Sequence, residues 1–142
     1  MKVYLEDHTN SLTEEQKSSL TKLSHHVLKK LRVSTNKELC VTFINDTTMR
    51  EYNTFYRNIR KTTDVLSFPQ DGPDNKILGD IIISTETAKR RSKVYQIGFD
   101  EEIANLVIHG ILHLLGYDHK HKREAILMRE KEKELLSNLK SL

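Results

Sequence analysis

Three histidines in the second half of the chain have the spacing of metal ligands. His109, His113 and His119 lie in the segment His-Gly-Ile-Leu-His-Leu-Leu-Gly-Tyr-Asp-His. On a helix, residues four apart lie on the same face, so the first two imidazoles can bind one metal ion. Gly116 follows the apolar helical run and suits the left-handed conformation at a helix end, which lets the chain bring His119 to the same ion. The spacing therefore predicts a metal site with three protein ligands and an open fourth position, as in catalytic zinc sites.

The residue after the first histidine distinguishes this motif from that of zinc peptidases. Peptidases of the His-Glu-x-x-His type carry a glutamate there, which acts as general base. In this chain the position is Gly110, which has no side chain to take a proton. A bound metal alone can still lower the pKa of its water toward neutrality. The motif thus argues against peptide hydrolysis, and a glutamate from another segment near the metal would revive that alternative.

The histidine segment and three further motifs resemble the YbeY family of bacterial endoribonucleases. The histidine segment is similar to the family signature, and the other motifs precede it in the family's order. They are Asn-Thr-Phe-Tyr-Arg at 53–57, Thr-Asp-Val-Leu-Ser-Phe-Pro at 63–69 and Leu-Gly-Asp at 78–80. Together the motifs span residues 53–119. One departure is Thr62, which stands where the family commonly has proline.

The resemblance implies a zinc-dependent endoribonuclease, a hydrolase that cuts phosphodiester bonds of single-stranded RNA. It implies a role in maturation of the 3′ end of small-subunit rRNA and in ribosome quality control, with rRNA and the ribosome or its small-subunit precursor as partners. The implied cofactor is one Zn²⁺ per chain, and three imidazoles also suit Ni²⁺, copper or iron. The nucleophile stays open between water and the RNA 2′-hydroxyl; a 2′,3′-cyclic phosphate product would exclude direct attack by water.

Arg57 is the first candidate for a catalytic residue other than a metal ligand. A guanidinium binds phosphate through two parallel hydrogen bonds and keeps its proton, so it can hold the scissile phosphate and offset developing charge. The resemblance supports this choice, because the arginine of the Asn-x-x-Tyr-Arg element is a functional position in the family. Arg60 and Lys61 extend this basic cluster in the following loop and are candidates for substrate binding.

A second basic cluster, Lys89, Arg90, Arg91 and Lys93, lies on a predicted helix. It can contact RNA phosphates, although charge runs of this kind are usually solvated helix faces. Asp80 interrupts an apolar strand, where a carboxylate must be paired or solvated. It can orient a ligating imidazole or hold a neighbouring loop.

The remaining polar and aromatic candidates are assigned weaker roles. Asp118 can orient an imidazole or hold the backbone of a loop, and Ser67 can place a hydroxyl in the cleft or cap a turn. Neither is expected to be catalytic. Phe55 and Tyr56 can stack a base, with core packing favoured for at least one of them. The charged run 129–134 reads as a solvated helix face and is assigned no site.

Length and composition favour one small globular domain, residues 1–142. The formal net charge of +3 is too small to prove nucleic-acid binding, so RNA must meet a local basic patch. The single cysteine, Cys40, cannot form an intrachain disulfide, which suits a reducing cytoplasm, and we expect it to pack in the interior. No apolar run suits a membrane span or a signal peptide. We therefore expect a cytoplasmic protein with no membrane partner.

Hydrophobic periodicity predicts an α+β domain. Four segments have strand patterns: 2–6, 38–45, 64–68 and 77–83. Five segments have helical patterns. The first starts at two overlapping capping boxes in residues 11–16 and runs to about residue 32, and the others are 46–57, 85–96, 100–115 and 121–139. The order βαβαββααα predicts a small mixed four-stranded sheet packed with about five helices. The last two strands should be antiparallel neighbours, with the metal site on the fourth helix and the loop after it.

Two other functions fit parts of the sequence. A metallopeptidase-like hydrolase shares the histidine spacing and lacks the usual base at Gly110. A non-catalytic ribosome assembly factor would use the metal mainly for structure. Removing the metal would then unfold the domain, and a charge-neutral change at Arg57 would leave the cellular role intact.

Overall fold

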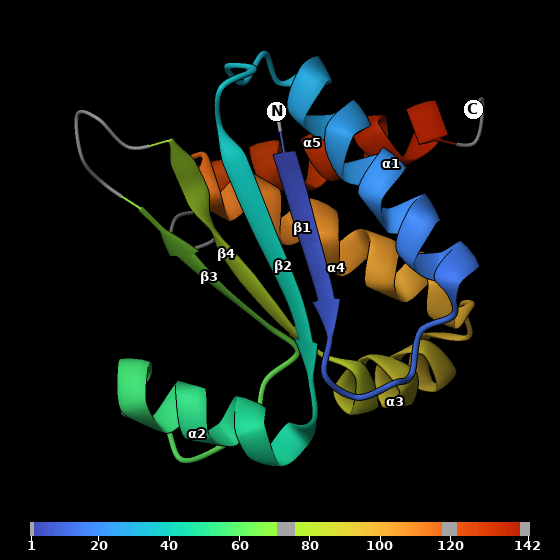
Figure 1. Cartoon of the computed structure of the whole chain (residues 1–142), viewed down its shortest axis with the longest axis vertical. Helices are drawn as coiled ribbons and strands as arrows, with labels where there is room; N and C mark the ends of the chain where they lie inside the picture. The colour runs from blue at the N-terminus through green and yellow to red at the C-terminus, as the bar shows by residue number, and fades with distance from the viewer. Residues whose placement is uncertain (1, 71–75, 118–121, 140–142) are drawn as a thin grey trace.

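The computed structural model describes residues 2–70, 76–117 and 122–139. Within these ranges the strands are β1 (Lys2–Asp7), β2 (Glu38–Ile44), β3 (Val65–Pro69) and β4 (Ile77–Ser84). The helices are α1 (Glu14–Lys30), α2 (Asp46–Arg57), α3 (Thr85–Tyr95), α4 (Phe99–Leu114) and α5 (Lys122–Leu139). The element order and the α+β class confirm the prediction (Figure 1).

The four strands form one mixed sheet in the order β1-β2-β4-β3. β1 and β4 both run parallel to β2, whereas β3 runs antiparallel to β4, which confirms the predicted pairing of the last two strands. β3 is therefore an edge strand. Its outer side borders the candidate site described below, at the left of Figure 1.

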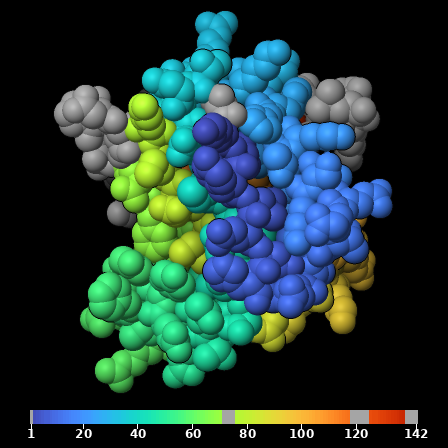
Figure 2. All heavy atoms as spheres, in the orientation of Figure 1, coloured from blue at the N-terminus to red at the C-terminus, as the bar shows by residue number. Residues whose placement is uncertain are grey.

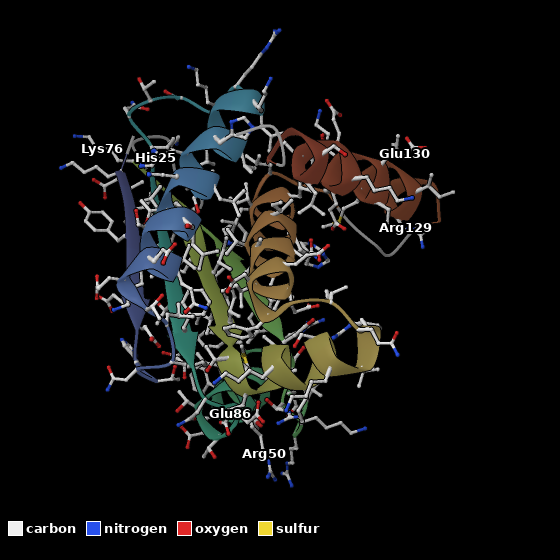
Figure 3. The ribbon with its side chains drawn as sticks, turned by 90° about the vertical axis from the view of Figure 1, so that its right-hand side faces the viewer. His25, Arg50, Lys76, Glu86, Arg129 and Glu130 are labelled. Atoms are coloured by element: carbon white, nitrogen blue, oxygen red, sulfur yellow. The ribbon has the colours of Figure 1, made fainter. Side chains whose placement is uncertain are left out.

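The main core lies on one face of the sheet, beneath α1 and α4 (Figures 1 and 3). Leu39, Val41 and Phe43 alternate along β2 and are fully buried against these helices. α5 packs on α4 from the outside and adds Met128 and Leu135 to the same core. The alternation explains why one face of β2 is apolar, since successive side chains of a strand point to opposite faces.

The opposite face of the sheet is covered only in part, by α2. A small second core joins Met49 of this helix to Leu66 of β3 and Ile82 of β4. Cys40 lies between the buried positions of β2 and is half-buried, so the expected interior position holds only in part. Burial and the charge of Asp80 raise the pKa of its thiol. A raised pKa disfavours the thiolate, so a nucleophilic role for this cysteine is not supported.

The start of α1 is fixed by a side chain that the sequence signals. Thr13 accepts from the backbone N–H of Gln16, whose own side chain accepts from the Thr13 N–H. Of the two predicted capping boxes, the one at Thr13 is therefore the one that starts α1. None of the helices in the described ranges has the length and apolar content to cross a membrane.

Asp46, the first residue of α2, ties this helix to the start of α3. Its carboxylate accepts hydrogen bonds from the hydroxyls of Ser84 and Thr87, each at 2.6 Å, and pairs with Arg90 at 2.7 Å. Burial by itself raises the pKa of Asp46, but these hydrogen bonds and the Arg90 charge lower it to about 2. This cluster therefore fixes the direction in which α2 leaves the sheet.

Candidate active site

His109 and His113 lie one turn apart on α4, and their ring centroids are 4.6 Å apart. The predicted shared face of the helix is confirmed. Both rings line an open cleft of about 780 Å³. Within the described residues no group of three metal-ligating side chains is assembled. His119 and Asp118 fall outside those residues, so the third ligand stays a prediction.

The end of α4 has the conformation that the glycine predicts. Gly116 is left-handed, with a φ of 97°, and its N–H donates to the carbonyl of His113. The N–H of Tyr117 donates to the carbonyl of Leu112, which completes the glycine-terminated helix end known as a Schellman motif. The helix thus ends within one turn of His113, and the chain changes direction beside the cleft.

Arg57 enters the same cleft from a distant part of the chain. It is the last residue of α2, and the next residue, Asn58, is left-handed with a φ of 55°. Arg57, His109 and His113 all line the cleft. Among the described residues the guanidinium of Arg57 has no hydrogen bond or ion pair. The structure therefore brings the predicted phosphate-binding residue together with the histidine pair, and no described carboxylate pairs with its charge.

Asn53 explains why the segment after α2 keeps its shape. Its side chain is buried and donates a hydrogen bond of 2.8 Å to the carbonyl of Lys61. Arg60 and Lys61 are exposed on this segment, outside the set of described residues that line the cleft. Their role in substrate binding stays a prediction.

The wall between Arg57 and the histidines is the edge strand β3 with the residues before it. Ser67 lines the cleft, and its hydroxyl donates to the carbonyl of Gly110 at 3.3 Å. Gly110 itself faces the sheet: an added Cβ would lie 2.7 Å from Cγ2 of Ile81. A glutamate at this position would point into the core, so the missing peptidase base reflects close packing of α4 on β4.

A glutamate that the sequence analysis missed contacts the first histidine. Oε1 of Glu132, on α5, lies 3.0 Å from Nδ1 of His109. The exposed fractions of these side chains are 25% and 26%, so the pair is largely shielded from water. The run 129–134 is predicted to be a solvated helix face, but its Glu132 side chain faces inward, toward His109. The available signal was helical spacing, because Glu132 lies four residues after Met128 and three before Leu135, which are both buried.

The Glu132 contact supports the histidine pair as metal ligands. A carboxylate that accepts from Nδ1–H leaves the lone pair of the imidazole on Nε2, the atom that would then bind a metal. Metal-ligating histidines usually have such a partner on their second nitrogen. The donor set of neutral imidazoles fits zinc and neighbouring transition metals.

Asp80 does not take the orienting role considered for it. Gly110 of α4 packs against Ile81, so the adjacent Asp80 lies on the other face of the sheet. There its carboxylate accepts from the side chain of Gln70 at 3.5 Å. The carboxylate that contacts an imidazole is Glu132 instead.

The second basic cluster is engaged mostly within the protein. Arg90 pairs with Asp46, Arg91 pairs with Asp64 at 2.8 Å, and Lys89 lies over the ring of Phe99. Asp64 lines the cleft, so its pairing with Arg91 connects α3 to the start of β3. These contacts favour a structural role for the cluster over RNA binding.

The fold and the cleft define the class of protein. It is an α+β domain in which a histidine pair on a helix and an arginine share one open cleft, an arrangement suited to an anionic substrate. Comparison with known proteins identifies the family. A family model described as Endoribonuclease YbeY matches residues 2–140. The chain belongs to this family, as the sequence motifs predict.

Individual relatives agree with this assignment. The Endoribonuclease YbeY of Clostridium botulinum (strain Hall) is 35% identical over 160 aligned positions, which cover 96% of each chain. That of Thermoanaerobacter sp. (strain X514) is 40% identical over 128 positions, which cover 80% of each chain. The solution structure of TM1509 from Thermotoga maritima has a TM-score of 0.71 at 25% identity, covering 96% of this chain and 88% of that one.

Proposed function

We propose that this chain is a metal-dependent endoribonuclease that cuts single-stranded RNA during maturation of the 3′ end of small-subunit rRNA and in ribosome quality control. The observation that carries the proposal is the shared cleft of Arg57, His109 and His113. Membership of the endoribonuclease family supports RNA as the substrate. The proposed partners are rRNA and the small-subunit precursor or ribosome, which puts the activity in the cytoplasm.

Two sets of residues in the cleft have different proposed roles: the histidines bind metal, and Arg57 binds phosphate. His109, His113 and His119 would hold one divalent ion, Zn²⁺ by preference, with Ni²⁺ as a substitute in purified samples. When bound, the metal supplies Lewis acidity that draws negative charge from a phosphodiester. Glu132 holds the ring of His109 through Nδ1. Arg57, which lines the same cleft, would bind the non-bridging oxygens of the scissile phosphate and offset the charge that grows on them.

The described carboxylates near the cleft argue against the metallopeptidase alternative. Asp64 lines it but is paired with Arg91, and Glu132 is bonded to the ring of His109. Position 110 faces the core. Among the described residues, no carboxylate is placed as the peptidase base.

The proposal is tested by metal analysis together with cleavage of an end-labelled single-stranded RNA. The variants are His113→Ala, Arg57→Ala and, as a control, His25→Ala, which removes an exposed histidine of α1 (Figure 3). We expect His113→Ala to lose both metal and cleavage, Arg57→Ala to keep metal and lose cleavage, and the control to keep both. The chemistry of the product ends then identifies the nucleophile.

Two outcomes of this experiment would contradict the proposed function. Stoichiometric metal with uncut RNA in the wild type, under conditions where a control nuclease cuts, would refute activity of the isolated protein. Unfolding on metal removal with no effect of Arg57→Ala in cells would favour the assembly factor with a structural metal.

A further inference from the structure

The last turn of α2 carries two exposed aromatic side chains. Tyr56 lines the cleft, whereas Phe55, next to it, borders a separate hollow of α2 with Thr47 and Thr54. The exposed fraction is 82% for Phe55 and 56% for Tyr56. Figure 2 shows α2 and the segment after it as a lobe at the lower left, beside β3 and β4. An isolated exposed aromatic residue is unremarkable. Two adjacent ones beside an arginine that has no ion pair with any described residue need an explanation.

These rings continue a line of aromatic contacts that begins inside the cleft. Phe68 and Tyr56 both line the cleft, and their ring centroids are 4.8 Å apart. Phe55 meets the Tyr56 ring edge-on, at 4.9 Å. Tyr56 also stacks on Tyr52 at 5.9 Å, which fixes its orientation. The line therefore leads from the cleft outward to one nearly free aromatic face, that of Phe55.

The charges around these rings suit a nucleic acid. Arg57, Arg60 and Lys61 follow within six residues of Phe55, and no acidic residue lies between Glu51 and Asp64. Arg57 lines the same cleft as Tyr56 and Phe68. A backbone phosphate on Arg57 would leave the neighbouring base within reach of the aromatic rings.

We propose that Phe55 and Tyr56 form a stacking subsite for an unpaired RNA base adjacent to the phosphate that Arg57 holds. This inference rests on the proposed function and names the feature that makes the enzyme select single strands. Bases within a duplex are already stacked on their neighbours, so only an unpaired base presents a face to these rings. Stacking accepts any base, because every base has a π-face, so the subsite selects strandedness rather than sequence.

The test uses the absence of tryptophan from the chain. Phe55→Trp introduces the sole tryptophan, whose fluorescence a stacked base quenches. The matched control is Val94→Trp on α3, where the native side chain is 76% exposed and does not line the cleft. Metal-loaded protein is titrated with a 2′-O-methyl RNA decamer, its all-abasic counterpart and the corresponding duplex. The RNA is checked for integrity afterward, and binding is followed independently by the anisotropy of a 5′-fluorescein label.

We expect saturable quenching of the Phe55→Trp protein by the single strand, little quenching by the abasic strand or the duplex, and none in the control. Phe55→Ala and Phe55→Leu should both weaken single-strand binding by roughly 5- to 150-fold, since both lack the ring. Both should fold, as circular dichroism would check, because the Phe55 side chain is exposed.

Two results overturn the subsite in different ways. Wild-type affinity in Phe55→Ala, with no quenching of Phe55→Trp by bound RNA, refutes the subsite alone and leaves the pair as a surface for a protein partner. Failure of the wild type to bind or cut any single-stranded RNA refutes the proposed function and the subsite together.

Discussion

The Glu132 carboxylate lies 3.0 Å from Nδ1 of His109, so α5 supports a ring that α4 presents to the cleft. The two residues are far apart in sequence, and the contact depends on how α5 packs against α4. The relationship gives α5 a function besides covering the core. It also makes the orientation of His109 sensitive to a side chain that touches no substrate.

Replacing Glu132 by glutamine should weaken metal binding. The amide can still accept from Nδ1–H, but the loss of the negative charge makes the imidazole a poorer ligand. Changes to such supporting partners typically cost about 10- to 100-fold in metal affinity. Competition with a chromophoric chelator would measure the loss, and the absorption bands of the cobalt-substituted protein would report altered coordination.

The control for this change is Glu130→Gln, which removes the same charge from an exposed position of α5 (Figure 3). Its metal affinity should match that of the wild type. Equal affinities in all three proteins would show that the Glu132 contact does not support the metal site.

Arg57→Lys should recover only part of the activity that Arg57→Ala loses. Lysine keeps the positive charge but cannot make two parallel hydrogen bonds to one phosphate. We expect Arg57→Ala to lower kcat/KM for RNA cleavage by roughly 100- to 1,000-fold, as for other donors aimed at developing charge. Lys30→Ala is the control, because Lys30 is an exposed cation of α1 that lines neither the cleft nor the hollow beside Phe55. A similar loss in both alanine variants would indicate general electrostatic attraction instead of a phosphate clamp.

Gly110→Ala should destabilise the fold through contact with Ile81. The added Cβ would lie 2.7 Å from Cγ2 of this side chain, closer than packed carbon atoms tolerate. Overpacking of this kind typically costs about 1–3 kcal/mol in free energy of unfolding. Urea unfolding followed by circular dichroism would measure the cost. In a double-mutant cycle with Ile81→Ala the two losses should be less than additive, and strict additivity would show that the clash is not with Ile81.

Local patterns in the sequence specify most of this fold. Capping residues, apolar periodicity and the glycine after His113 predicted the elements, their order and the end of α4. These features depend on neighbours within one or two turns of chain. The histidine spacing and the Asn-x-x-Tyr-Arg motif likewise pointed to His109, His113 and Arg57, which line one cleft.

Contacts between elements that are distant in sequence could not be predicted from such local patterns. Glu132 appeared to be one of several alternating charges, and only the packing of α5 on α4 turns it toward His109. Asp80 appeared suited to orient an imidazole, but the register of β4 places it on the other face of the sheet. The basic run of α3 resembled an RNA-binding face until Asp46 and Asp64, from other segments, were found to pair with Arg90 and Arg91.

Because of Asp46, the free energy of unfolding should fall as the pH is lowered into the acid range. Its pKa is about 2 in the folded protein, against 3.8 for the unperturbed carboxyl. A depressed pKa contributes stability that is fully present above pH 3.8 and is lost as the pH falls toward 2. The contribution is on the order of 2 kcal/mol, because each pKa unit corresponds to about 1.4 kcal/mol. Asp46→Asn should therefore be less stable than the wild type at pH 6, and the difference should shrink toward pH 2.

Urea unfolding at a series of pH values would measure this dependence, with Glu51→Gln as the control at an exposed acidic position of the same helix. The control should follow the wild type throughout. A gap between wild type and Asp46→Asn that stayed constant with pH would mean that the hydroxyl and guanidinium donors do not hold the charged form. In that case the link from α2 to α3 would depend on shape rather than on the Asp46 charge.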